Sequence, residues 1–150
     1  MLRNPNEKIV RKPWGNERWL ADGTTTPYAM KRILFQSGQR SSLQVHEFKV
    51  ETNYVLSGHG TFLLSRKPIN VQGWLNAANK TVLRGKILED LQEIALEPEM
   101  VIDVPAGFVH RVIANTDLIF IECSTTELDD VVRIEDDLNR GNGRINSEHR

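Results

Sequence analysis

The sequence of 150 residues lacks a pair of cysteines, a large excess of charge of one sign and long apolar segments. It has one cysteine, Cys123, so no disulfide can form within the chain, which is typical of a reducing compartment. Cys123 lies inside an apolar run and is expected to be a buried packing residue. The 19 basic residues are matched by 20 acidic residues, and this net charge of -1 favours neither nucleic acid nor an anionic membrane as a partner.

Long apolar segments are also missing. The first twelve residues, MLRNPNEKIVRK, lack the apolar stretch of a secretory signal, and no run reaches membrane-spanning length. The 39% of hydrophobic and 26% of charged residues are typical of a soluble globular protein, and the length suits one domain with a sizeable core. We therefore expect a single domain over residues 1–150, cytoplasmic, and either an enzyme or a binding protein.

What the sequence does contain is a rhythm of short apolar or β-branched runs separated by Gly, Pro, Asn and Asp. The predicted strands are 17–20, 28–35, 43–46, 52–57, 61–64, 92–96, 101–104, 109–114 and 118–124. This rhythm predicts an all-β fold, an antiparallel β-sandwich or barrel. Gly38 and Gly58 are expected at tight turns, where a residue without Cβ is favoured.

Two segments depart from the strand rhythm. Residues 65–91 are expected to form an inserted loop with a short helical turn near 74–78. This loop is a lid, a dimer contact or a surface elaboration, and the sequence does not choose among them. Residues 125–150 form a charged tail, in which Val131, Val132 and Ile134 give a short strand-like pattern.

Four potential metal ligands lie in two short stretches of the chain. Gln44 and His46 are two residues apart, so on a strand both side chains leave the same face. Glu51 is expected to reach that face from the start of the next strand, and His110 from a strand end after a Pro-x-Gly turn. Each residue alone has an ordinary structural explanation, but the four together suit one divalent ion of Zn, Mn, Fe, Co or Ni.

These two stretches resemble the two motifs of the cupin superfamily, with Gln44 standing where many cupins have their first histidine. In this replacement the chain is similar to the cupin domain of type II phosphomannose isomerases, including those fused to a GDP-mannose pyrophosphorylase. The likeness extends to KPWG at 12–15, KRI at 31–33 and VRIEDDLNR at 132–140. It implies a cupin antiparallel β-barrel, or jelly roll, that pairs as a homodimer through its sheets.

The resemblance also implies a metal-dependent aldose–ketose isomerase in nucleotide-sugar or polysaccharide biosynthesis, converting mannose 6-phosphate to fructose 6-phosphate. Such a reaction moves a proton between neighbouring carbons, and a metal ion assists it by polarising the carbonyl. Lys31, Arg40 and Arg140 are the candidate sugar-phosphate-binding cations, and Lys31 and Arg140 are also candidate catalytic residues. Each of the three cations has a salt bridge to an acidic residue as its structural alternative.

Several alternatives stay open. The sequence does not identify the general base, for which Lys31, Glu47, His59 and Glu122 are all candidates. The chain has Glu47, Lys49, Thr52 and Asn53 where the family usually carries His, Arg, His and Trp, so a different sugar is also possible. Two histidines and a carboxylate also fit a non-haem iron dioxygenase. A sugar-binding cupin without catalysis is the third possibility.

Overall fold

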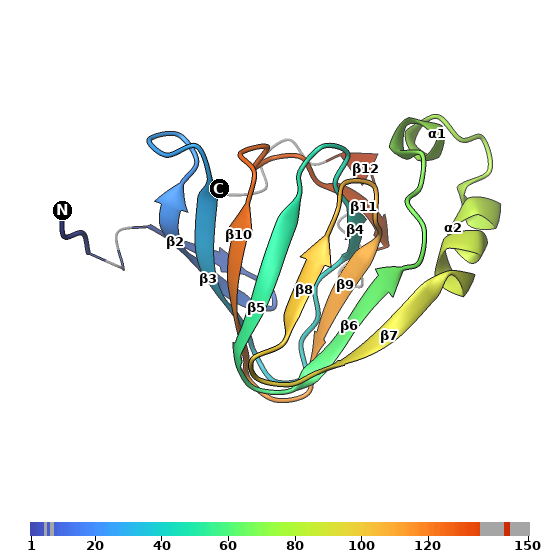
Figure 1. Cartoon of the computed structure of the whole chain (residues 1–150). Coiled ribbons are helices and arrows are strands. Elements are labelled where there is room, and N and C mark those ends of the chain that lie inside the picture. Colours follow the sequence, from blue (N-terminus) through green and yellow to red (C-terminus); the bar gives the residue numbers. More distant parts are fainter. Residues whose placement is uncertain (5, 7, 136–142, 145–150) are drawn as a thin grey trace.

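The computed structural model describes residues 1–4, 6, 8–135 and 143–144, and shows two antiparallel sheets packed face to face (Figure 1). The first sheet contains, in spatial order, β1 (Ile9–Lys12), β2 (Gly15–Asp22), β3 (Ala29–Phe35), β10 (Leu118–Ser124), β5 (Glu51–Ser57) and β8 (Val101–Val104). The second contains β12 (Gly143–Arg144), β11 (Val132–Glu135), β4 (Leu43–Val45), β9 (His110–Ala114), β6 (Gly60–Ser65) and β7 (Leu91–Leu96). The predicted all-β antiparallel fold is confirmed.

The sheets enclose an apolar core near one end of the barrel. It is built by alternate residues of strands from both sheets, among them Phe35 of β3, Phe62 of β6 and Phe120 of β10. Trp14, just before β2, stacks on Phe35 with ring centroids 4.4 Å apart and helps to close this end. The turns between the sheets gather here, at the bottom of Figure 1. Two of them contain Gly38 and Gly58, whose φ angles of 81° and 93° explain the need for glycine.

Residues 65–91 form two helices rather than the expected loop with one turn. They are α1 (Val71–Leu75), capped by Asn70, and α2 (Lys80–Glu89), capped by Asn79. In each helix the asparagine side chain accepts a hydrogen bond from the backbone N–H three residues later. Ser65 and Leu91 are paired partners at the ends of β6 and β7, so the insertion leaves and rejoins the sheet at one point.

The two helices pack against a few outward-facing residues of the second sheet, where a second apolar cluster forms. Val71 and Trp74 of α1 and Ile87 of α2 pack there against strand residues such as Val45 and Ile134. Ile87 is the one buried residue among the ten of helix α2, and the partly buried Leu83 also packs against the cluster. Neither helix has the length and apolar character needed to cross a bilayer, and the described residues contain no other helix.

The nine strands predicted from the sequence correspond to β2 through β10, with ends within two residues. The sequence pattern missed β1 and most of α2, while the apolar positions around Val132 form β11. The prediction for Cys123 was wrong, because this residue is exposed. Strand β10 alternates, so Phe120, Glu122 and Ser124 point inward and Cys123 points outward.

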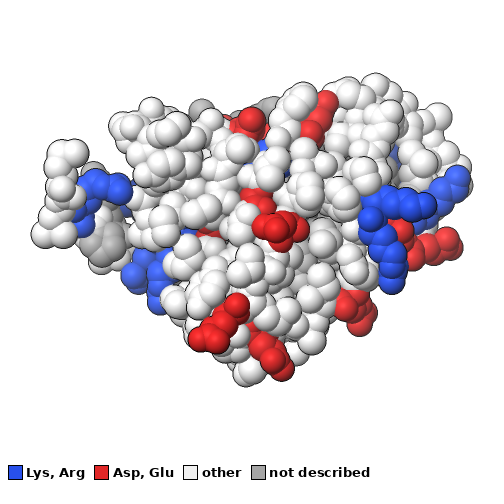
Figure 2. All heavy atoms as spheres, in the orientation of Figure 1, with Lys and Arg blue, Asp and Glu red and all other residues white. Residues whose placement is uncertain are grey.

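Charged side chains are unevenly spread over the visible face of the molecule. Figure 2 shows Lys and Arg gathered toward the N-terminal end and around α2, with a largely uncharged middle that carries isolated acidic groups. The charges that matter for the candidate site are different ones, because they are buried inside the barrel.

Candidate metal centre

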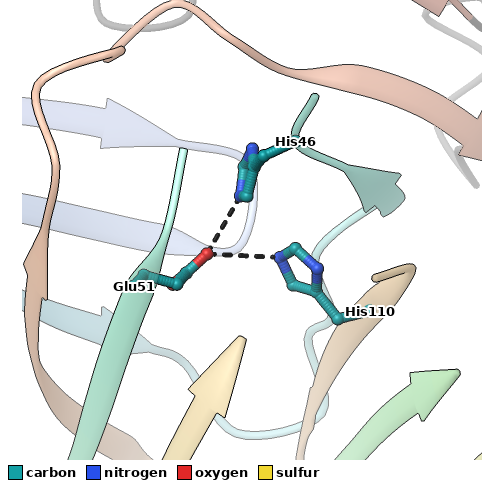
Figure 3. A group of neighbouring side chains, drawn as sticks. All are labelled: His46, Glu51 and His110. Atoms are coloured by element: carbon teal, nitrogen blue, oxygen red, sulfur yellow. Dashed lines mark hydrogen bonds and ion pairs between the residues drawn. The ribbon is translucent and has the colours of Figure 1, made fainter. Parts of the chain in front are cut away.

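Three of the predicted ligands meet inside the barrel (Figure 3). His46 follows β4, Glu51 opens β5 and His110 opens β9, so the site joins both sheets. All three side chains are buried, with 2% to 5% of their surface exposed. Gln44 is the paired partner of His110 across β4 and β9, and it lines the same cavity. Directly paired residues share a sheet face, so all four predicted ligands belong to one cavity.

The separations between the ligand atoms suit a single metal ion. His46 Nε2 lies 2.9 Å and His110 Nε2 lies 3.5 Å from the same carboxylate oxygen, Glu51 Oε1. Metal–ligand bonds of about 2.1 Å place neighbouring ligands about 3.0 Å apart at octahedral angles and about 3.4 Å apart at tetrahedral angles. The observed separations therefore match ligands that share one cation.

The hydrogen bonds of the two imidazoles support the same conclusion. His46 Nδ1 donates to the carbonyl oxygen of Asp130 at 2.7 Å, and His110 Nδ1 donates to that of Phe108 at 3.0 Å. A carbonyl can only accept, so in a neutral ring each proton is on Nδ1 and each Nε2 carries a lone pair. Both lone pairs then point at a carboxylate oxygen, an arrangement that a shared cation would stabilise.

The donor set has the electrostatic character of a cation site. Burial lowers the pKa of His110 to about 4, against the opposing effect of Glu51, so this imidazole is neutral at pH 7. Burial acts to raise the pKa of Glu51, but the nearby Lys49 ammonium is the largest opposing effect, and that pKa lies well below its usual value. The second oxygen of Glu51 accepts a hydrogen bond from Asn53 at 3.0 Å. A fixed carboxylate at Glu51 and a neutral imidazole at His110 are the kinds of ligand that a divalent ion requires.

No protein-family model matches the sequence, and no curated protein is significantly similar to it. Solved structures do match. They include the capsular polysaccharide assembling protein CapF from Staphylococcus aureus, with 17% identity, a TM-score of 0.62, and coverage of 86% of this chain and 32% of CapF. Another is Rru_A2000 from Rhodospirillum rubrum, described as a cupin-2 domain, with 15% identity, a TM-score of 0.61, and coverage of 87% and 77%.

The chain has the cupin fold. Ectoine synthase from P. lautus shares it, with 13% identity, a TM-score of 0.59, and coverage of 84% of this chain and 78% of the synthase. The chain spans about a third of the length of CapF. Cupin structures therefore include enzymes, and the jelly roll expected from the sequence is confirmed.

Beside the candidate metal centre, the barrel buries a group of four further charged side chains. Lys31 is 1% exposed and lies 4.0 Å from Glu17 and 3.9 Å from Glu122. Lys49 lies 3.2 Å from the same Glu122 oxygen. Lys31, Glu122 and Asn53 are successive partners across β3, β10 and β5, so they form a polar row that leads to Glu51. The row places Glu122 between two ammonium groups and near the candidate metal ligands.

The protonation of this group is set by competition between burial and charge. Burial lowers the pKa of Lys31, and the attraction of Glu122 only partly opposes this. Burial also acts to lower the pKa of Lys49, but Glu122 and Glu51 outweigh it, so that pKa is raised. Burial, followed by repulsion from Glu51, raises the pKa of Glu122 despite the two lysines. A buried carboxyl with a raised pKa is the kind of group that transfers protons near neutral pH.

The other predicted residues lie in different places. Arg40 is exposed, forms a bridge to Ile113 and does not line the cavity. Arg140 lies outside the described residues. Among the base candidates, Lys31 and Glu122 line the cavity, whereas Glu47 binds Gln72 of α1 and His59 lies in a turn. Residues 65–91 are all described and none of them lines the cavity, so the insertion does not cover this site.

Several cavity residues had not been predicted as site residues. Lys49 and Glu17 belong to the buried charge group, and Lys12 and Arg133 line the same cavity. The period of two along β2 could have identified Glu17, because this residue lies two positions before Trp19 and so faces the interior with it. Lys49 lies in the connection between β4 and β5, where strand periodicity gives no signal.

Proposed function

We propose that this cupin is a metal-dependent isomerase that moves a proton between neighbouring carbons of a sugar phosphate. The observation that carries the proposal is the buried group formed by Glu17, Lys31, Lys49 and Glu122, which shares one cavity with the metal ligands. A protein that used the cavity only for packing would have no reason to bury four charges, since each is costly to remove from water.

His46, Glu51 and His110 would hold one divalent ion, with the amide oxygen of Gln44 as the fourth ligand. The Ser42 hydroxyl donates to this oxygen at 2.9 Å and so supports the orientation of the amide. The four groups carry a single negative charge, so a divalent ion bound there supplies strong Lewis acidity toward a carbonyl oxygen. Oxygen and nitrogen donors suit Zn, Mn, Fe, Co or Ni.

Glu122 is the proposed proton carrier. Its carboxylate would take the proton from the carbon beside the carbonyl and return it to the neighbouring carbon, while the hydrogen of the hydroxyl group passes to the former carbonyl oxygen, so no proton is gained or lost overall. Lys49 and Lys31 hold the carboxylate from two sides and stabilise it while it is charged. Lys31 lines the same cavity, which supports the catalytic and substrate-binding roles that the sequence suggested for it.

The charge of the cavity favours an anionic substrate. Four cationic side chains, Lys12, Lys31, Lys49 and Arg133, line it together with three acidic ones, Glu17, Glu51 and Glu122. A divalent ion adds to this excess of positive charge, so a phosphate-bearing ligand is attracted. Mannose 6-phosphate is the first substrate to test, because it is the one implied by the resemblance in sequence.

The experiment is an isomerase assay on protein of verified metal content, with mannose 6-phosphate and a panel of other aldose phosphates in deuterated water. Turnover with deuterium entering the product at the carbon beside the carbonyl is the expected result. Glu122→Gln should lower the rate by about 10²- to 10⁴-fold, the usual worth of a general base. The absence of both turnover and exchange across the panel, with metal bound, would exclude the isomerase.

An oxygen-dependent reaction is the second candidate, because His46, Glu51 and His110 also form a two-histidine, one-carboxylate set. Oxygen uptake that requires Fe(II) would favour it, whereas full activity under anaerobic conditions would exclude it. Saturable saccharide binding without turnover in either assay would indicate a binding protein.

A homodimer is also proposed. The outer face of the first sheet carries a cross-strand row of Ile121, Tyr54 and Val101, and Leu56 lies nearby on β5. Tyr54, Leu56 and Val101 are 37%, 45% and 61% exposed, respectively. Sedimentation analysis of the wild type and of Val101→Lys tests this proposal. A monomeric wild-type protein at micromolar concentration would contradict it.

A further inference from the structure

The connection between β10 and β11 holds the loop that carries the metal ligands. This loop, residues 46–51, begins at His46 and ends at Glu51. The backbone N–H groups of Glu47, Phe48 and Lys49 donate to the carboxylate of one residue, Asp130, at 3.1, 2.6 and 2.9 Å. The N–H of the next residue, Val50, donates to the Thr125 hydroxyl at 3.0 Å. Four successive N–H groups of the loop are therefore bound by a single distant segment.

Asp130 contacts the metal centre in a second way. Its backbone carbonyl accepts the hydrogen bond from His46 Nδ1 at 2.7 Å. One residue thus fixes the ring of the first histidine and the loop that leads to Glu51. Asp130 is 8% exposed, so these hydrogen bonds are shielded from water.

The chemistry of these contacts makes them strong. Three successive N–H groups form a concave anion site, and a carboxylate that fills it makes charge-assisted hydrogen bonds. The pKa of Asp130 is lowered because the hydrogen bonds from Phe48, Lys49 and Glu47 outweigh the effect of burial. The same contacts fix the backbone of Lys49, whose ammonium reaches Glu122.

We propose that Asp130 is the positioning residue of the metal centre. Its carbonyl selects the His46 tautomer that exposes the Nε2 lone pair, and its carboxylate fixes the distance between His46 and Glu51. It touches neither metal nor substrate, and acts through the ligands that it holds. The proposal rests on the metal centre proposed above and adds the part of the chain that assembles it.

The test compares two neighbouring substitutions that remove the same charge. Asp130→Asn leaves one acceptor oxygen and places an NH₂ group against backbone donors. Asp129→Asn alters an exposed residue beside it. Titration with Zn²⁺ and Co²⁺ should show a rise in Kd of about 10- to 100-fold for Asp130→Asn, the usual effect of losing an outer partner of a metal ligand. Asp129→Asn should leave the Kd unchanged.

Two further measurements separate positioning from general loss of stability. Leu118→Ala, at the apolar end of the barrel, should lower the free energy of unfolding without raising the metal Kd. The electronic spectrum of bound Co²⁺ should change in Asp130→Asn and not in Leu118→Ala. Equal Kd values for the wild type and Asp130→Asn would overturn the proposal.

Nuclear magnetic resonance of the histidine side chains tests the inference without metal. The wild type should show His46 protonated on Nδ1, with that hydrogen protected from exchange, and Asp129→Asn should match it. Loss of this protection in Asp130→Asn would support the positioning role even if the wild type bound no metal, a result that would defeat the proposed function alone. If Asp130→Asn does not fold, Thr125→Val replaces it, because Thr125 binds the N–H of Val50 in the same loop. An unchanged metal Kd in Thr125→Val would contradict the claim that the β10–β11 connection positions residues 46–51.

Discussion

The two ends of the barrel interior are built from the same strands and yet have opposite character. Along β3 the inward residues are Phe35 and Ile33 toward one end and Lys31 toward the other. Along β10 they are Leu118 and Phe120, followed by Glu122. Each strand therefore contributes to an apolar end and to a charged end, and the change occurs within two residues.

This difference separates the stability of the fold from its chemistry. The apolar end gains stability from burial, at roughly 25 cal/mol for each Å² removed from water. The charged end gains little, because the cost of removing ions from water offsets much of their attraction. Substitutions at the two ends should therefore affect different measured quantities.

The largest expected effect is on metal affinity, at the charged end. His110→Ala removes a ligand whose ring is fixed by the Phe108 carbonyl, and the affinity should fall by more than the roughly 100-fold that outer partners are worth. Calorimetric titration with Zn²⁺ measures this. His59→Ala is the control, because His59 lies in a turn away from the cavity and should leave the affinity unchanged. Wild-type affinity in His110→Ala would contradict the site.

The next effect is on stability, at the apolar end. Leu118 is fully buried and does not line the cavity, so Leu118→Ala should lower the free energy of unfolding by about 2–5 kcal/mol. Urea denaturation measures the change, and metal titration of the folded variant should give the wild-type affinity. A large loss of affinity in this variant would show that the two ends are not separate.

Acidification should lower the free energy of unfolding of the metal-free protein through groups at the charged end of the barrel. The pKa of His110 is about 4 in the folded state and 6.5 in the unfolded chain, so the unfolded chain binds more protons between these values. The free energy of unfolding therefore falls as the pH drops through this window, by roughly 3 kcal/mol from this residue.

Glu122 opposes this trend, because its raised pKa makes the folded state bind more protons above about pH 4.5. The Glu122→Gln variant should consequently show a steeper loss of stability from pH 6.5 to 4. Urea denaturation with a chelator present measures both slopes, and His110→Ala in the Glu122→Gln background should flatten the curve. A slope unaffected by His110→Ala would contradict the assignment.

The smallest effect on stability is expected from a substitution on the outward face of β10, the strand that contributes to both ends of the interior. Cys123→Ser should change the free energy of unfolding by no more than about 0.5 kcal/mol, because the side chain is exposed. A thiol reagent should label Cys123 in the native Val101→Lys variant, which the proposed interface predicts to be monomeric. Failure to label it until the protein unfolds would indicate that this face is covered.

The sequence predicted the strands well because alternation of inward and outward residues has a period of two that is visible in the chain. It predicted His46, Glu51 and His110 from their donor types, their places on expected strands and the resemblance to the cupin motifs, and the structure brings the ligand atoms of these three residues together. It could not predict Asp130, because a contact across 84 residues with a loop backbone leaves no periodic signal. Cys123 was misjudged because hydrophobic neighbours conceal which face a strand residue takes.

The paired ends of the insertion have a practical consequence. Ser65 and Leu91 sit opposite each other in the ladder, which places their Cα atoms about 5 Å apart. A foreign segment with closely spaced termini could be grafted between them with little loop-closure penalty. The grafted segment would need an apolar face of its own. Val45 and Ile134 pack against α1 and α2, and without such a face they would be exposed to solvent.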